Sequence, residues 1–257
     1  MPTDSRASTV KIEICTNSVQ SALAAQAGGA DSVELCENLA EGGTTPGYGA
    51  ISQTREALTI ALYPIIRPRG GDFLYDTLDF EIMKKDIAIC KQLGCDGVVF
   101  GILTADGKID RERCKILAEI AGDMQLTFHR AFDLAVDPWE ALEEIIDLGF
   151  KRILTSGGRN TAEEGASLIQ QLVMKAEGRI SIVAGSGVGV NNIAWLAEIT
   201  RAKAFHARAT RRIPSQMKFH KLHMTMGHQP MDLGCDVTDA DLVRQIRDIA
   251  ERILDQH

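Results

Sequence analysis

Eight short apolar runs rich in β-branched residues recur along this chain, and stretches with helical periodicity separate them. The runs cover residues 10–16, 32–38, 61–69, 97–103, 125–132, 152–158, 180–187 and 204–211. Strands that alternate with helices are typical of parallel sheets built with right-handed crossovers. Eight such units close into a barrel, and the first strand lacks the glycine fingerprint of a doubly wound dinucleotide-binding sheet. We therefore predict an α/β protein, a (β/α)8 TIM barrel.

The length of 257 residues is about that of one such barrel, and no linker or low-complexity stretch divides the chain. We expect one TIM-barrel domain over residues 1–257, with a flexible N-terminus at 1–9 and the final barrel helix at 239–254. Residues 212–236 are predicted to form a long loop after the eighth strand. Loops of this length are commonly lids or docking arms.

Charge and cysteine usage narrow the classes of partner. The formal net charge is -7, so the chain lacks the positive field that nucleic acids and anionic membranes require. No apolar run is long enough to span a membrane, and the first residues do not resemble a secretory signal. The six cysteines are scattered through the chain, which is typical of reduced thiols. We expect a cytoplasmic location.

Strand alternation predicts which side chains point into the barrel. Where alternate residues suit the helix layer, the others must face inward. The inward set contains Glu13, Cys15, Glu34, Cys36, Arg67, Arg69, Thr127, His129, Ser156, His206 and Arg208. Buried charges are costly unless they pair with each other or with a ligand. The set is either a structural ion network or a functional site at the carboxyl ends of the strands, where barrel sites lie.

Two cysteines occupy matching places on adjacent strands. Glu13-Ile14-Cys15 and Glu34-Leu35-Cys36 put the thiols of Cys15 and Cys36 about one strand spacing, roughly 5 Å, apart. Two facing thiolates suit a soft monovalent ion such as Cu(I). A disulfide, or simple packing of two small apolar side chains, would explain the same pattern.

Basic and glycine-rich turns predict an anion site. Arg67, Arg69 and Asp72 lie in the turn Arg67-Pro68-Arg69-Gly70-Gly71-Asp72, where guanidinium groups could clamp a carboxylate or a phosphate. The predicted anion-binding set is completed by loop residues Ser156, Gly157, Gly185 and Gly187 and by Arg208. Glycines in ordinary tight turns are the alternative for these loops.

Two histidines at strand ends are candidates for acid–base chemistry. His129 and His206 could act as general acid or base, with Glu13 or Glu34 as the partner or as the reacting base. His129 could equally be a metal ligand or a core histidine with satisfied hydrogen bonds.

At the level of whole motifs, the chain resembles the CutC family, which is named for copper homeostasis. The matching strings are Ile12-Glu13-Ile14-Cys15, Val33-Glu34-Leu35-Cys36, Glu41-Gly42-Gly43-Thr44-Thr45-Pro46, the residues from Ile66 to Tyr75, Thr127-Phe128-His129-Arg130-Ala131-Phe132-Asp133 and Leu154-Thr155-Ser156-Gly157-Gly158. The resemblance runs from about residue 10 to residue 211. It implies a cytoplasmic TIM barrel, usually oligomeric, that handles copper, with the two copper-associated cysteines of the family at Cys15 and Cys36.

Two functions follow as hypotheses, and a scaffold that works through the long C-terminal loop and the oligomer surface is a third alternative. The first is a copper homeostasis protein that binds Cu(I) through Cys15 and Cys36 and forms a homo-oligomer, a dimer or a tetramer. The second is a TIM-barrel enzyme that acts on a small carboxylate or phosphate, held by the arginines, with the histidines and glutamates as catalytic groups.

Overall fold

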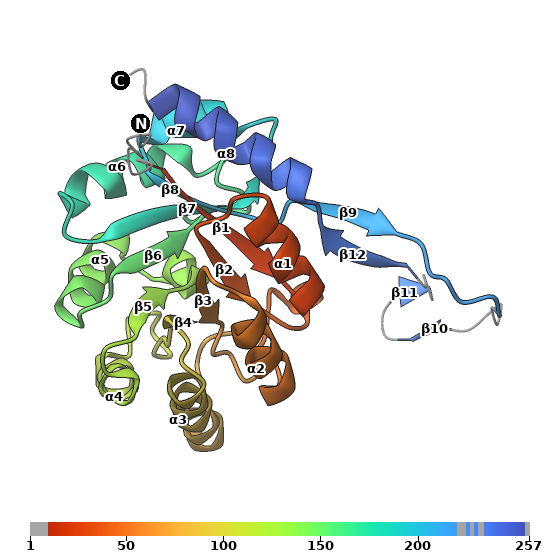
Figure 1. Ribbon diagram of the computed structural model, residues 1–257. Coiled ribbons are helices and arrows are strands. Elements are labelled where there is room, and N and C mark those ends of the chain that lie inside the picture. The colour runs from red at the N-terminus through yellow and green to blue at the C-terminus, as the bar shows by residue number, and fades with distance from the viewer. Residues whose placement is uncertain (1–9, 220–224, 227–228, 231–233, 255–257) are drawn as a thin grey trace, which may run out of the picture.

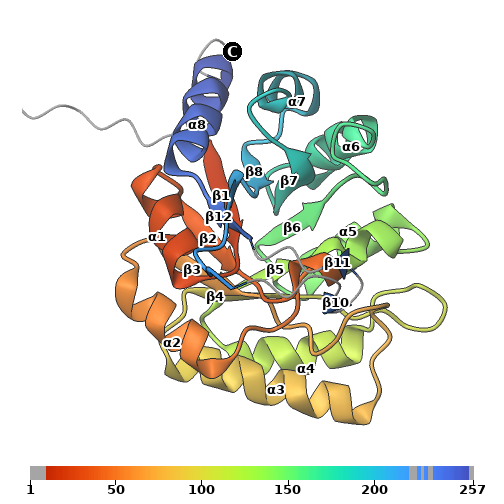
Figure 2. The same cartoon turned by 90° about the vertical axis from the view of Figure 1, so that its right-hand side faces the viewer.

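The computed structural model describes residues 10–219, 225–226, 229–230 and 234–254. The flexible N-terminus expected at residues 1–9 lies outside this part of the chain. Eight parallel strands form one sheet in the order β3-β2-β1-β8-β7-β6-β5-β4, and helices surround it (Figure 1 and Figure 2). The structure therefore confirms the predicted TIM barrel.

Each predicted apolar run coincides with one barrel strand, although β7 extends one residue beyond its run. The strands are β1 (Lys11–Thr16), β2 (Ser32–Leu35), β3 (Ala61–Pro64), β4 (Gly97–Phe100), β5 (Gln125–Phe128), β6 (Arg152–Thr155), β7 (Ser181–Val188) and β8 (Ala204–Ala207). Most are shorter at their carboxyl ends than the runs suggested. Apolar and polar residues continue to alternate after the hydrogen bonds between strands have ended. The last part of a run, including His129 and Arg67, therefore belongs to the loop that follows the strand.

The barrel closes between β3 and β4, where the pairing is thinnest. An isolated parallel bridge joins Ile65 to Val99. Backbone hydrogen bonds across this seam run from Ile66 N to the Val99 carbonyl, 2.8 Å, and from Asp96 N to the Leu62 carbonyl, 3.2 Å. Backbone N–H groups alternate in direction along a strand, so residue 64 would donate toward β4, as Ile66 does. Pro64 has no N–H to give, which accounts for the weak seam at this point.

Helices cover the outside of the barrel, and several of them begin at polar caps. The Asp76 carboxylate accepts from Asp79 N at the start of α3, and Gly94, at φ 73°, follows its end. The main helices are α1 (Val19–Ala27), α2 (Tyr48–Ala57), α3 (Thr77–Gln92), α4 (Arg111–Ala121), α5 (Pro138–Asp147), α6 (Ala166–Ala176), α7 (Ile193–Thr200) and α8 (Ala240–Leu254). Their apolar faces and the outward strand residues form one continuous core.

After β8 the chain leaves the barrel as an arm (Figure 1). Strands β9 (Thr210–Ile213) and β12 (Cys235–Thr238) pair antiparallel at its base, and β10 (Thr225–Met226) pairs with β11 (Gln229–Pro230) farther out. The segment 212–236, predicted as a long loop after the eighth strand, therefore contains short paired strands where the structure describes it. Backbone hydrogen bonds between the outgoing and returning sides of the arm form short two-stranded ribbons. The periodicity of apolar residues does not predict such pairing in a polar segment.

Candidate functional site

A cavity of about 550 Å³ opens at the carboxyl ends of the barrel strands. Side chains from nearly every strand end or loop contribute to its wall. The lining residues are Cys15, Glu34, Leu39, Glu41, Gly42, Ile65, Arg67, Phe73, His129, Arg130, Asp133, Leu134, Leu154, Ser186, Gly187, Val188, His206, Ala207, Arg208 and Ala209. The cavity lies where active and binding sites of TIM barrels are found.

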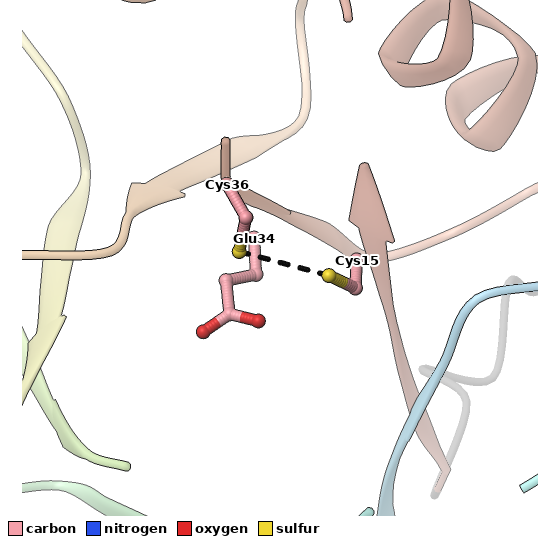
Figure 3. A group of neighbouring side chains, drawn as sticks. All are labelled: Cys15, Glu34 and Cys36. Carbon is pink, nitrogen blue, oxygen red and sulfur yellow. Dashed lines mark hydrogen bonds between the residues drawn. The ribbon is translucent and has the colours of Figure 1, made fainter. Parts of the chain in front are cut away.

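Two thiols lie together at this end of the barrel. Cys15 is near the end of β1, and Cys36 directly follows β2. Their sulfur atoms share a hydrogen bond at 3.6 Å, shorter than the spacing expected from the strands alone. Figure 3 shows the sulfurs facing each other, with the Glu34 side chain beside them. Both cysteines are free and buried, and together with Glu34 they form a group whose ligand atoms all lie within 4.8 Å of one another.

A carboxylate and an imidazole pair across the top of three adjacent strands. The register places Cys15 beside Glu34 and Glu13 beside His206, because β1 lies between β2 and β8. The His206 Nε2 atom lies 2.7 Å from Glu34 Oε2. Burial disfavours the charged imidazole, but the Glu34 carboxylate and the Cys15 thiol outweigh it and raise the pKa of His206 well above its usual value. This pair is therefore an ion pair near neutral pH.

The two thiols differ in acidity although they contact each other. A hydrogen bond from Cys36 lowers the pKa of the Cys15 thiol to about 7; burial opposes this shift and the His206 imidazolium assists it. The hydrogen bond to Cys15, burial and the nearby Glu34 charge raise the pKa of Cys36 well above its usual value. The first proton is therefore lost from Cys15, which has the cation beside it, and Cys36 keeps its proton as the donor.

This asymmetry predicts the reactivity of the metal-free protein. Since the thiolate is the nucleophile, alkylation of Cys15 by iodoacetamide should rise through a midpoint near pH 7, the pKa of about 7 at this thiol. Changing Cys36→Ala removes the donor and should move the midpoint upward. Peptide mass spectrometry after timed labelling measures each cysteine separately, and the exposed Cys235 serves as the internal reference. An unchanged midpoint in the variant would contradict the assignment.

Arg67 and His129 form a second group in the wall of the cavity, and Phe73 contacts both of them. The Arg67 guanidinium lies 5.1 Å from the Phe73 ring centre, and the Phe73 and His129 ring centres are 4.8 Å apart. Burial, and then the Arg67 charge, lower the pKa of His129 to about 3. The imidazole is neutral under physiological conditions, so His129 can donate or accept a hydrogen bond but does not carry a charge.

Glu13 lies below the cavity and does not line it. Glu13 is 1% exposed. Its carboxylate pairs with Arg152 at 2.7 Å and accepts a hydrogen bond from Ser32 Oγ at 2.8 Å. Sequence reasoning missed Arg152, although the alternation that turned Ser156 inward also turns Arg152 inward on the same strand. The catalytic role predicted for Glu13 therefore has an immediate structural alternative, the burial of an ion pair inside the barrel.

The structure places two residues of the predicted anion turn away from the cavity. Arg69 does not point inward: it pairs with Asp72 at 3.0 Å and with Asp79 of α3 at 2.9 Å. The inward prediction for Arg69 was wrong because β3 ends at Pro64, so strand alternation no longer applies to this turn. Arg67, by contrast, does line the cavity.

The loop after β6 binds a carboxylate side chain of the same protein. The Asp133 carboxylate accepts hydrogen bonds from the backbone N–H groups of Ser156, 3.0 Å, and Gly158, 3.0 Å. Gly157 N donates to Thr155 Oγ1. The donors that were expected to bind a ligand at Ser156 and Gly157 are therefore engaged, and the loop is held to the short helix η2 (Arg130–Leu134).

The loops after β7 and β8 complete the wall of the cavity. Gly187, at φ 74°, and the exposed Arg208 line it. Gly185 lies lower, where a Cβ atom would come within 2.5 Å of Leu154 and 3.3 Å of His206 Cβ. Its role in the structure is to give these two side chains room.

Other lining residues carry no signal in a single sequence. Phe73 lies in the turn after β3, and Glu41 and Leu134 end the short helices η1 (Leu39–Glu41) and η2. No apolar periodicity indicates the direction of side chains in segments this short. Arg130 and Asp133 lie within η2, the short helix that follows His129, and they pair at 2.8 Å. The quoted motif around His129 contains both, and their spacing of three residues in a helix was the available signal.

Comparison with known proteins places these observations in a family. The model of the CutC family matches residues 10–211. A CutC family protein from Chromobacterium violaceum is 48% identical over 242 residues, which cover 94% of this chain and 98% of that protein. The human copper homeostasis protein cutC homolog is 44% identical over 248 residues, 95% of this chain and 90% of that protein.

Solved structures agree in fold. The CutC protein of Streptococcus agalactiae superposes with a TM-score of 0.74 at 36% identity and covers 77% of this chain and 98% of its own. Thiamine phosphate pyrophosphorylase from Pyrococcus furiosus reaches a TM-score of 0.60 at 14% identity, over 96% and 98% of the two chains. At that identity the likeness concerns the barrel fold alone.

Proposed function

This chain belongs to the CutC family, whose members include copper homeostasis proteins, and we propose that it binds Cu(I) in the cytoplasm between the thiolates of Cys15 and Cys36. The observation that carries this proposal is the pair of free, buried sulfur atoms 3.6 Å apart. Thiolate sulfur is the donor that selects Cu(I) over harder ions.

The donor set favours a soft ion of low coordination number. Among the residues that the structure describes, the group able to hold a metal contains only Cys15, Cys36 and Glu34. Structural zinc sites use four nitrogen or sulfur ligands, and Glu34 is already engaged by His206. Two sulfur donors are therefore what this site offers, and two sulfurs suit a monovalent copper ion.

The acidities of the two thiols assist metal uptake. Copper binds the deprotonated sulfur, and the Cys15 thiol, with its pKa of about 7, is partly ionised at neutral pH. The ion would then displace the proton that Cys36 shares with Cys15. His206 lies close enough to Cys15 for this thiol to help raise the pKa of the imidazole. The positive charge of His206 would offset the second thiolate.

An anaerobic titration with Cu(I) against a competing chelator tests this proposal. We expect one Cu(I) per chain, and X-ray absorption should show sulfur in the first coordination sphere of the ion. Binding weaker than that of ordinary surface thiols, or a first sphere of nitrogen and oxygen, would contradict it.

We also propose that the chain forms a homo-oligomer, a dimer or a tetramer. Met217 and Phe219, 57% and 73% exposed, extend the arm beyond β9, and exposed apolar side chains of this kind mark contact surfaces. Light scattering during size-exclusion chromatography measures the oligomeric state directly.

The free cysteines support the proposed location of the chain in the cytoplasm, where thiols stay reduced. Among the described residues, no helix is long and apolar enough to cross a bilayer.

A further inference from the structure

Copper binding leaves the guanidinium groups and the volume of the cavity unused, and we propose that the cavity also binds a small organic anion, a carboxylate or a phosphate monoester. The anion would lie between Arg67 and Arg208, with its apolar part against the aliphatic wall. Neither arginine contacts the thiols through any hydrogen bond of the described residues, so the two sites can be tested separately.

Arg67 is a buried cation with no acidic partner among the described residues. It is 5% exposed, and its Nη atoms donate to three backbone carbonyls, those of Glu41, Gly43 and Gly71, at 2.6 to 2.8 Å. Its Nε atom has no hydrogen-bond partner in this part of the chain. Carbonyl groups hold a guanidinium in place but do not neutralise it. Burial of an uncompensated charge is costly, so a bound anion would stabilise this arrangement.

Arg208 supplies a second cation at the rim. It is exposed and lines the cavity, and we find no hydrogen bond or ion pair for it within the described residues. Arg130 is paired with Asp133, and His206 with Glu34. The lining carboxylate that remains is the exposed Glu41. The guanidiniums of Arg67 and Arg208 therefore share the wall with one carboxylate that is unpaired among the described residues, which leaves an excess of one positive charge in a protein whose net charge is -7.

His129 adds an unsatisfied donor. It is 3% exposed, and its Nδ1 atom accepts from Ala131 N at 3.3 Å. Because the pKa of about 3 keeps the ring neutral, the proton must be on Nε2, which has no partner among the described residues. A buried donor without an acceptor is rare in native proteins. A ligand oxygen that reached this wall would satisfy it beside the Arg67 charge.

The rest of the wall indicates that the anion carries an apolar part. Leu39, Ile65, Leu134, Leu154 and Val188 line the cavity, and its volume of about 550 Å³ exceeds what a single inorganic ion would fill. An aromatic or aliphatic body joined to one anionic group matches this combination of charge and hydrocarbon surface.

Four probes with matched parts test the site by calorimetry and thermal shift, on wild type and on the Cys15→Ser/Cys36→Ser variant. Phenyl phosphate and benzoate share the ring and differ in the anionic group, phenol lacks the charge, and inorganic phosphate lacks the ring. We expect phenyl phosphate or benzoate to bind both proteins, at least about tenfold more tightly than phenol or inorganic phosphate. Which of the two binds more tightly identifies the anionic group.

Two charge-matched variants locate the binding. Arg208→Gln should weaken the favoured probe by about tenfold to a hundredfold, the usual effect of losing one charge-assisted hydrogen bond, and should leave the thermal midpoint of the ligand-free protein unchanged. Arg201→Gln removes the same charge from the loop before β8, at the opposite end of the barrel, and should bind as wild type does. Failure of both anions to bind at about 10 mM, equal binding of phenol, or equal weakening in the two variants would overturn the proposal. Loss of copper binding alone would not overturn the proposal of an anion site.

Discussion

Replacing Cys15 and Cys36 together with serine is expected to lower the affinity for Cu(I) by about a thousandfold or more, or about 4 kcal/mol. The reason is that both soft donors of the site are lost, and serine oxygen is a poor ligand for Cu(I). Each single variant should lose a large part of the affinity, because the remaining sulfur has only the Glu34 carboxylate beside it in the ligand group. Anaerobic competition with a chelator measures all three variants on the same scale.

The chain contains a matched control for this experiment. Cys90 and Cys95 are also free and buried, and they also interact through their thiols, since a hydrogen bond from Cys90 lowers the pKa of Cys95. They lie at the end of α3 and before β4, away from the cavity. Cys90→Ser/Cys95→Ser should leave the affinity for Cu(I) unchanged. Equal losses in the two double variants would show that the chain binds copper through thiols in general rather than at one site.

Breaking the ion pair inside the barrel should give the largest loss of stability. Arg152→Met leaves Glu13 buried without its cation, and we expect the free energy of unfolding to fall by about 3–5 kcal/mol, the cost of an uncompensated buried charge. Glu13→Gln/Arg152→Met removes both charges and should recover part of this loss. Urea denaturation followed by circular dichroism measures the difference.

A surface pair of the same residue types provides the comparison. Arg179 and Glu143 are joined by two hydrogen bonds, at 2.6 and 2.9 Å, and their side chains are 39% and 44% exposed. Water screens this pair, so Arg179→Met should cost much less than Arg152→Met. A similar cost for both variants would contradict the view that burial makes the inner pair essential.

The inner pair also predicts a dependence on pH. Burial opposes ionisation of Glu13, but Arg152 outweighs it and lowers the pKa of this carboxyl below the ordinary value of 4.5. A lowered folded-state pKa contributes stability that is complete above the unfolded value and is lost as the pH falls through the folded one. Wild type should therefore lose stability below about pH 4.5, and the double variant should lose less over the same range.

Local periodicity was sufficient for the framework of this fold. Eight apolar runs with helices between them predicted the barrel, because side-chain period and β-branched composition express secondary structure residue by residue. The same alternation placed Cys15 and Cys36 on neighbouring strands, and the barrel brings their sulfurs to 3.6 Å. It failed for Arg69, where the turn after Pro64 had already left the strand.

The sequence by itself determined the order of strands and helices along the chain, the family, and the residue types that gather at the strand ends. These features depend on local patterns and whole motifs. Only the tertiary structure decided which of these groups meet. Arg152 neutralises Glu13 from across the barrel, Asp133 takes the donors of the loop after β6, and Glu34 holds His206 rather than an arginine. Such pairings depend on distances across a closed barrel, and one strand read alone contains no information about what lies opposite.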